Sequence, residues 1–136
     1  EDLLSIFTSG ISEGIIIIQD EQIQFANRKF GKIVDKKWNE IKGTHFLDYF
    51  PIQYRRMLYK KYTKRIEKKI YREMTYEVEL LSTSGKVTPF ELSSSLVEYG
   101  NRPAVMVVFR DISAKKEAEE HLKEAEKKYR SIFEKM

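Results

Sequence analysis

Three segments near the end of the chain alternate between apolar and polar residues, and only short turns separate them. Residues 84–85 (Ser-Gly) and 100–101 (Gly-Asn) are typical turn pairs, and a third, mostly apolar segment runs from Ala104 to Phe109. A period of two is typical of strands, and strands joined by short turns are antiparallel neighbours. The residues expected to share one face are Tyr76, Val78 and Leu80 in the first segment and Phe90, Leu92, Ser94 and Leu96 in the second.

Two more strands are predicted near the start of the chain. Ile15 to Ile18 are four β-branched residues in a row, and Ile23 and Phe25 alternate with polar residues after a turn at residues 20–22. Strands at both ends with helices between them predict an α+β fold, a five-stranded antiparallel sheet covered by short helices. The expected helical segments are residues 2–12, a helix capped by Asn27 that begins at Arg28, an aromatic turn from Phe46 to Phe50, and a helix from Ile52 to Arg72.

A heptad pattern dominates the last part of the chain. Its apolar positions are spaced alternately four and three residues apart, and glutamates and lysines fill the outer positions. This strict alternation is typical of a coiled-coil seam, whereas a core-facing helix carries a broader stripe. We therefore expect a homodimer through this helix; an ordinary amphipathic tail is the alternative. The seam consists of Ala118, Leu122, Ala125, Tyr129, Ile132 and Met136.

Composition limits the classes of protein to which the chain can belong. Its 136 residues suit one domain, and no apolar run approaches the roughly 18–20 residues of a membrane helix, so we expect no membrane insertion. The absence of cysteine excludes disulfides and cysteinyl chemistry and is compatible with a cytoplasmic location, which we expect. The chain begins at Glu1 rather than Met, and the tripeptide at residues 5–7 (Ser-Ile-Phe) recurs at 131–133. We therefore expect a fragment of a longer protein with tandem domains.

Four segments resemble the PAS family and follow one another in the order of that family. They are EGIIIIQD (residues 13–20), IQFANRKF (23–30), IKGTHFLDYF (41–50) and VVFRDISAKKEAEEHLKEAEKKYRSIF (107–133). The last segment resembles the final PAS strand, its DIT-type junction and the signalling helix. The resemblance implies a PAS sensor domain at residues 1–112, and a signalling helix with the start of a following domain at 113–136. The first hairpin, DEQIQF, lacks the usual glycine, which leaves its turn type open.

The junction at Asp111, Ile112 and Ser113 has a physical interpretation of its own. Ser113 is expected to cap the last helix by accepting backbone N–H groups, and Asp111 to place a negative charge near the positive end of that helix. Either interaction would fix the angle between sheet and helix, and each contributes about 1 kcal/mol of stability. The resemblance implies that the junction relays a signal; simple capping is the alternative.

No catalytic constellation or metal site is found in the sequence, and we do not expect this segment to be an enzyme. His121 is expected to be exposed on the last helix, and His45 to be a partly buried structural residue beside the aromatic turn, although a ligand contact stays open. Haem-binding PAS domains usually ligate iron from the long helix, which has no histidine here, so haem is not expected. A cysteinyl-flavin adduct is excluded, and noncovalent flavin stays open.

In PAS domains a ligand pocket lies between the inner face of the sheet and the helices. A dry core made of the same side chains is the alternative, because small domains need this burial for stability. Ser94 is the polar exception on its face and is the residue expected to touch a small-molecule ligand. The residues that the resemblance implies are Ile16, Ile18, Phe30, Phe46, Phe50, Met57, Tyr76, Val78, Phe90, Leu92, Ser94 and Val107.

The predicted function is a regulatory PAS sensor and dimerisation module. The implied parent is a sensor histidine kinase of a two-component system, with further PAS and effector domains downstream. A ligand-free dimerisation spacer and a PAS module of a cyclic-di-nucleotide signalling enzyme are alternatives. A third, nucleic-acid binding through the helix at residues 54–72, rests on nine Lys or Arg residues and a single acidic one between Arg55 and Arg72. Such a helix is more typical of a solvated face, so we expect no nucleic-acid partner.

Overall fold

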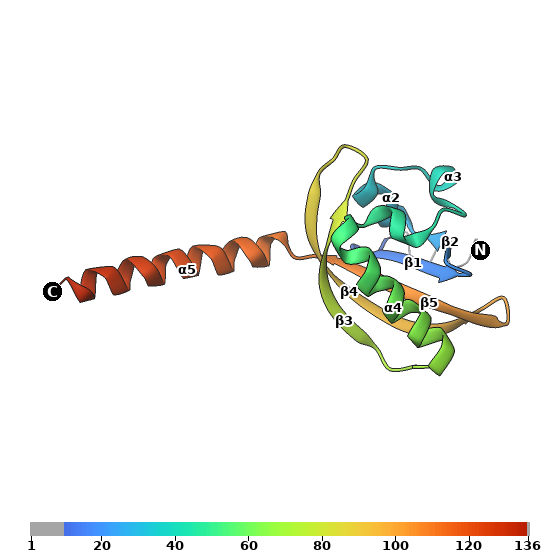
Figure 1. The fold of residues 1–136 in the computed structure, drawn as a ribbon. Helices are drawn as coiled ribbons and strands as arrows, with labels where there is room; N and C mark the ends of the chain where they lie inside the picture. Colours follow the sequence, from blue (N-terminus) through green and yellow to red (C-terminus); the bar gives the residue numbers. More distant parts are fainter. Residues whose placement is uncertain (1–9, 136) are drawn as a thin grey trace.

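A computed structural model describes residues 10–135, and its centre is one antiparallel sheet of five strands. The strand order is β2-β1-β5-β4-β3, so the last strand of the chain occupies the middle of the sheet (Figure 1). The predicted α+β class with five antiparallel strands is confirmed. The strands are β1 (Gly14–Gln19), β2 (Gln22–Ala26), β3 (Met74–Leu81), β4 (Val87–Tyr99) and β5 (Arg102–Asp111).

Short helices cover one face of this sheet, and the last helix leaves the domain. The covering elements are α2 (Arg28–Val34), α3 (Trp38–Ile41), the 3-10 helix η1 (Phe46–Tyr49) and α4 (Ile52–Lys68). Helix α5 (Ser113–Glu134) projects away from them as a single rod (Figure 1), and none of its residues, all of which the structure describes, is buried. The predicted helix at residues 2–12 falls mostly on residues 1–9, which lie outside the described part of the chain.

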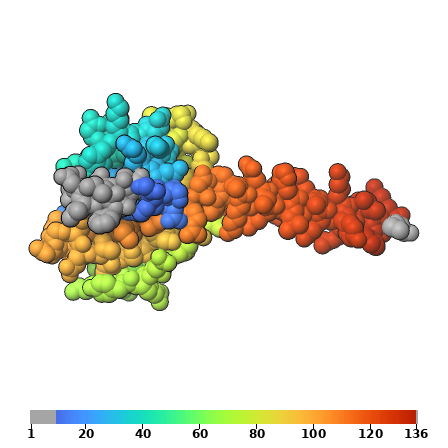
Figure 2. Space-filling view, turned by 180° about the vertical axis from the view of Figure 1, so that it is seen from behind, coloured from blue at the N-terminus to red at the C-terminus, as the bar shows by residue number. Residues whose placement is uncertain are grey.

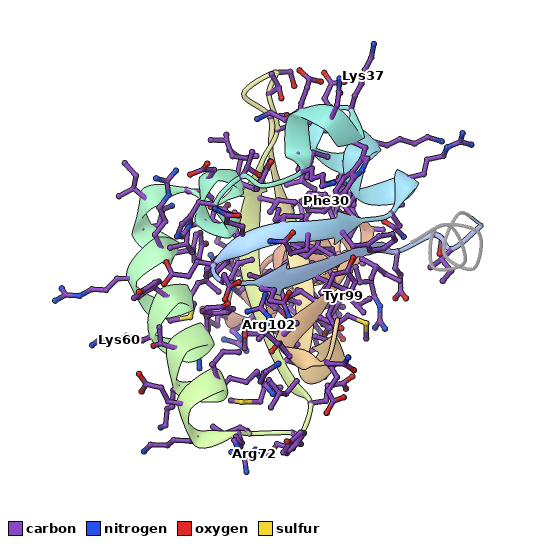
Figure 3. The ribbon with its side chains drawn as sticks, turned by 90° about the vertical axis from the view of Figure 1, so that its right-hand side faces the viewer. Phe30, Lys37, Lys60, Arg72, Tyr99 and Arg102 are labelled. Carbon is purple, nitrogen blue, oxygen red and sulfur yellow. The ribbon has the colours of Figure 1, made fainter. Side chains whose placement is uncertain are left out.

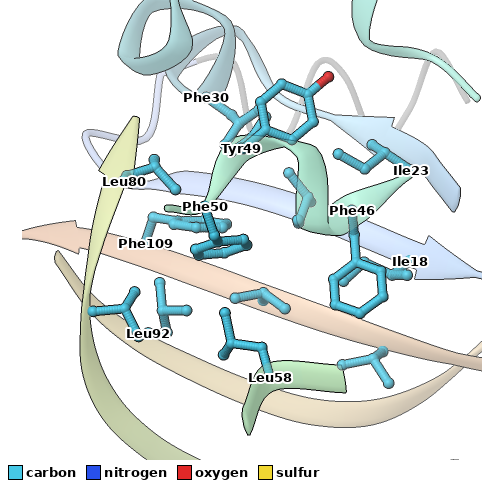
Figure 4. Packing of buried hydrophobic residues seen from close by; sticks show 14 of the residues in the cluster. Ile18, Ile23, Phe30, Phe46, Tyr49, Phe50, Leu58, Leu80, Leu92 and Phe109 are labelled. Atoms are coloured by element: carbon cyan, nitrogen blue, oxygen red, sulfur yellow. The ribbon is translucent and has the colours of Figure 1, made fainter. Parts of the chain in front are cut away.

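The core lies between the sheet and the covering helices. Phe109 of the central strand β5 is at its middle, with ring centroids 5.1 Å from Phe30 and 6.3 Å from both Phe50 and Phe90 (Figure 4). Val78 and Phe90 are buried at the positions that the period of two predicted. The apolar face of the last three strands therefore packs on the helices, as the alternating pattern requires.

Asn27 joins the first hairpin to helix α2. Its Oδ1 accepts the N–H groups of Phe30, at 3.0 Å, and Ile15, at 2.9 Å. Its Nδ2 donates to the carbonyl of Glu13 at 2.9 Å. The predicted N-cap is confirmed, and the same side chain also fixes the start of β1 against the helix.

The first hairpin makes its two-residue turn without glycine. Asp20 and Glu21 both have positive φ angles, 54° and 66°, as a type I′ turn requires. Each such residue costs roughly 1–2 kcal/mol when it carries a Cβ. Contacts with the helices offset this cost: the Glu21 N–H donates to the Tyr62 hydroxyl, and its carbonyl accepts from the Phe46 N–H, both at 3.1 Å.

Helix α4 ends four residues earlier than predicted. The sequence pattern extended it to Arg72, but Lys69 takes a left-handed conformation at φ 51° and its N–H donates to the Arg65 carbonyl. The apolar spacing from Ile66 to Ile70 imitates a further helical turn, so the pattern alone gives no stop signal. The chain must leave the helix here to enter strand β3.

Replacing Lys69 by glycine is expected to stabilise the protein by about 0.5–1 kcal/mol, because glycine adopts positive φ without a Cβ penalty. The same change at Lys68, the last residue of α4, should destabilise it by a similar amount, because glycine weakens a helix. Urea unfolding of both variants measures the difference. Equal effects of the two substitutions would contradict the assignment of the helix end.

Candidate functional site

A small cavity lies between the inner face of the sheet and α4. Its volume is about 30 Å³, two to three times the roughly 10–15 Å³ that a cavity needs to hold one water molecule. The cavity therefore has room for a very small molecule. The lining residues are Ile16, Ile18, Phe46, Phe50, Leu58, Lys61, Tyr62, Arg65, Tyr76, Leu92, Ser94, Val105, Val107 and Phe109.

Most of the pocket residues expected from the sequence line this cavity. The structure brings together Ile16, Ile18, Phe46, Phe50, Tyr76, Leu92, Ser94 and Val107. Four of the expected residues are elsewhere: Phe30, Val78 and Phe90 fill the hydrophobic core, and Met57 packs against its edge. Leu58, not Met57, lines the cavity on α4, because the face that turns to the sheet is offset by one residue from the one expected.

Arg65 lines the cavity but is not among the residues expected from the sequence. Its side chain is only 3% exposed, and its Nη2 donates to the Ser94 Oγ at 3.2 Å. Its Nη1 donates to the carbonyls of Ile70, at 2.7 Å, and Arg72, at 2.9 Å. Burial lowers the pKa of the guanidinium, Tyr76 opposes this and Arg72 adds to it. Leu58, Tyr62 and Arg65 are spaced four and three apart, which is the signal that was available.

Ser94 connects the strands to this arginine. It is 2% exposed, and its Oγ lies 3.1 Å from the hydroxyl of Tyr76 on the neighbouring strand. Its polar position on an otherwise apolar face is thus explained by two partners, the buried Arg65 and the half-buried Tyr76. The expectation that Ser94 touches a ligand stays a prediction.

His45 is a structural residue that does not line the cavity. Its Nδ1 accepts the N–H of Leu47 at 3.2 Å and so caps η1. Its Nε2 lies 3.1 Å from the carboxylate of Glu21, which also accepts the Tyr59 hydroxyl at 3.1 Å. His45 therefore links the first hairpin turn to the covering helices.

The junction residues lie where β5 turns into α5. Ile112 is 4% exposed and its N–H donates to the carbonyl of Pro89 at 3.2 Å. The expectation that the Ser113 side chain caps the helix was wrong: Asp111 Oδ1 accepts the Ser113 N–H at 2.8 Å instead. Ser113 is already the first helical residue, so its own side chain is one position too late to be the cap. The expected negative charge near the helix start is confirmed.

An ion pair on the other side of the sheet fastens α5 to β3. The Glu77 carboxylate lies 2.7 Å from the Nζ of Lys116 and 3.7 Å from that of Lys115, both in the first turn of α5. The hydrogen bond from Lys116 is the main reason why the pKa of Glu77 lies below its ordinary value. Because side chains alternate along a strand, Glu77 points outward while its neighbour Tyr76 reaches the cavity.

Two other surface features are less suited to a specific ligand. A wide groove of about 610 Å³ lies along α2 and α3, and charged residues such as Lys32 and Lys36 line much of it. The outer side of α4 carries exposed cations, among them Lys60, which points away from the sheet (Figure 3). Among residues 10–135, no three His, Asp or Glu side chains are grouped so as to hold a metal ion. No helix in the same residues is long and apolar enough to cross a bilayer.

Comparison with models of known protein families assigns the chain to one family. A model of the PAS domain matches residues 12–114, which cover all five strands and the helices packed on them. The chain belongs to the PAS family. PAS domains are generally regulatory sensor modules rather than catalysts. No curated protein matches this PAS domain significantly by sequence.

Solved structures share the fold of this PAS domain at low sequence identity. A PAS domain from a two-component sensor histidine kinase has a TM-score of 0.67 and 14% identity, over 81% of this chain and 94% of that one. A PAS domain of a LuxR-family transcriptional regulator from Burkholderia thailandensis, in complex with ethanol, has a TM-score of 0.64 and 14% identity, over 79% and 96%. An RNA-binding light-oxygen-voltage receptor has a TM-score of 0.70 and 14% identity, over 96% of this chain and 38% of that one.

Ser94→Ala is expected to destabilise the PAS domain by about 1–3 kcal/mol, because it leaves the buried Arg65 and the half-buried Tyr76 without their shared partner. Ser93→Ala is the matched control. Ser93 lies on the opposite face of β4, and its Oγ makes a long, exposed contact of 3.4 Å with the Thr75 Oγ. Urea unfolding compares the two. A loss for Ser94→Ala no larger than that for Ser93→Ala would contradict the buried network.

Glu77→Gln is expected to loosen the first turn of α5, so that its backbone amides exchange with solvent faster. Glu98→Gln on β4 is the control, since no ion pair joins Glu98 to another described residue. Because the pKa of Glu77 is lowered in the folded state, its contribution is complete above about pH 4.5 and is lost as the pH falls through the lowered value. Hydrogen exchange at several pH values measures this. Unchanged exchange in Glu77→Gln would contradict the role of the pair.

Proposed function

We propose that this PAS domain is a sensing and dimerisation module of a signalling protein, with a sensor histidine kinase of a two-component system as the parent. In this proposal residues 1–112 receive the stimulus, and residues 113–136 carry it to a following domain. The observation that carries the proposal is the unsupported apolar stripe of α5. Leu122 is 62% exposed, Tyr129 64% and Ile132 59%.

A free helix of this kind is not a stable end state in water. Twenty-two residues extend about 33 Å, and in proteins most of the stability of such a helix comes from the packing of its apolar face. Figure 2 shows the helix standing clear of the domain beyond its base. Pairing with a second copy buries the exposed seam of Ala118, Leu122, Ala125, Tyr129 and Ile132, while Met136 lies outside the described residues.

Strands β3 and β5 support a route from the cavity to this helix. Tyr76 on the inner face of β3 contacts Ser94 beside the cavity, and Glu77 on the outer face pairs with Lys116 of α5. Strand β5 lines the cavity with Val107 and continues through Ile112 into the helix. A shift of either strand therefore changes the angle of α5.

A ligand-free dimerisation spacer is the second candidate, and the small size of the cavity favours it. Native mass spectrometry of freshly purified protein separates the two, since a retained small molecule supports the sensor. The histidine kinase parent is supported by the fold shared with a kinase PAS domain, although the same fold also occurs in a transcriptional regulator. A PAS module of a cyclic-di-nucleotide signalling enzyme remains the alternative parent.

Leu122→Glu is expected to shift the chain from dimer to monomer, because it places a charge in the centre of the seam. Ser131→Glu introduces the same charge at an outer position of the same helix and should leave the dimer intact. Light scattering at several protein concentrations measures the mass. A wild-type chain that stays monomeric at high concentration would contradict the proposed dimer.

Ala125→Cys should form a disulfide-linked dimer under mild oxidation, because seam positions of paired helices face each other. The chain contains no cysteine, so each introduced thiol is the only one present. Lys127→Cys, on the outer side of the helix, is the control and should cross-link poorly. Equal cross-linking at both positions would mean random collision rather than a seam.

A further inference from the structure

Arg65 is a buried cation whose partners in the described structure are all neutral. The side chain is 3% exposed, and its three hydrogen bonds go to two backbone carbonyls and to the hydroxyl of Ser94. No ion pair joins it to a carboxylate among residues 10–135. Buried charges in proteins are normally paired, because removing an ion from water costs several kcal/mol. A positive charge therefore stands at the cavity wall without a counter-charge.

The rest of the cavity wall strengthens this imbalance. Lys61 lines the cavity one helical turn before Arg65, and its Nζ lies 5.1 Å from the centre of the Tyr76 ring. Among the described residues that line the cavity, none is acidic. Two cations on one face of α4 and no carboxylate produce a positive potential inside a mostly apolar chamber, where screening by water is weak.

We propose that this cavity binds a small carboxylate anion of two or three carbon atoms, held by the guanidinium of Arg65 and accompanied by the hydroxyls of Ser94 and Tyr76. The inference rests on the sensor function proposed above and names the chemical class of its ligand. A carboxylate suits the site because its two oxygens match the planar N–H groups of arginine. In the contact between Ser94 and Tyr76 either hydroxyl can be the donor, so one O–H is able to turn toward the anion.

The shape and lining of the cavity limit the rest of the ligand. Aliphatic side chains such as Ile16, Val105 and Val107 form much of the wall and suit a methyl or ethyl group. The volume of about 30 Å³ leaves no space for a long chain. Acetate thus fits better than butyrate, and a neutral amide of the same shape lacks the charge that Arg65 requires.

Thermal unfolding of the whole chain in acetate tests the proposal. The ionic strength is held constant with sodium chloride, and acetamide and butyrate are the comparison compounds. At ten times its dissociation constant, acetate should raise the Tm by about 3–6 °C, whereas acetamide and butyrate should leave it within about 1 °C. An equal rise with acetamide overturns the proposal. So does the absence of a rise at about 50 mM acetate, which is ten times a dissociation constant of about 5 mM.

Variants on α4 locate the effect. Lys61→Met should reduce the acetate response severalfold while keeping the hydrogen bonds of Arg65, and Arg65→Met should abolish it. If Arg65→Met fails to fold, Lys61→Met and Arg65→Lys still test acetate binding at this site. Arg65→Lys keeps the charge but loses the planar guanidinium, so it should weaken acetate binding about 10-fold. Lys64→Met removes an exposed charge from the same helix and should respond as the wild type does. A response that Lys64→Met and Lys61→Met lose equally indicates nonspecific anion binding and overturns the site.

The cross-linking of Ala125→Cys separates this inference from the proposed function. If the seam cross-links but acetate does not bind, the ligand class is wrong and the dimeric module stands. If acetate binds through Arg65 but no dimer forms, the cavity site stands and the route through a paired α5 fails.

Discussion

Strand β5 is the element on which the rest of the structure depends. It lies between β1 and β4, so it carries hydrogen bonds on both edges, and Phe109 near its end contacts three other buried rings. Its chain then continues through the buried Ile112 into α5. Because a central strand cannot move without disturbing both neighbours, the direction of the helix is tied to the packing of the whole sheet.

Strand β3 couples the two sides of the sheet in a different way. Side chains alternate across a strand, so consecutive residues reach separate environments: Tyr76 contacts Ser94 beside the cavity, and Glu77 pairs with the first turn of α5. The buried Arg65 belongs to the same arrangement, since it bonds Ser94 as well as the carbonyls that lead from α4 to β3. Arg65 therefore joins helix α4 to strand β4 and to the segment that enters β3.

The edge of the sheet shows how tertiary contacts replace a missing residue preference. Glycine is the usual residue for positive φ in a tight hairpin, yet Glu21 occupies such a position here. Its backbone bonds Tyr62 and Phe46, and its carboxylate bonds Tyr59 and contacts His45. These bonds fasten the hairpin to α4 and η1. A glycine at position 21 would lack the carboxylate and would lose its contacts with Tyr59 and His45.

The sequence by itself determined the strands, the cap at Asn27, the turns and the helix α5, because each depends on residues close together in the chain and on a simple period; the seam of α5 stays a prediction. The resemblance to the PAS family also identified eight lining residues of the cavity, six of them on strands and two, Phe46 and Phe50, at the aromatic turn. Only the tertiary structure decided the end of α4 at Lys68, the capping of α5 by Asp111 rather than Ser113, and the burial of Arg65. The physical reason for the burial of Arg65 is that a cationic side chain on a helix is solvated or buried depending on which strand packs against it. Ser94 lies 29 positions further along the chain than Arg65, and no local pattern brings the two together.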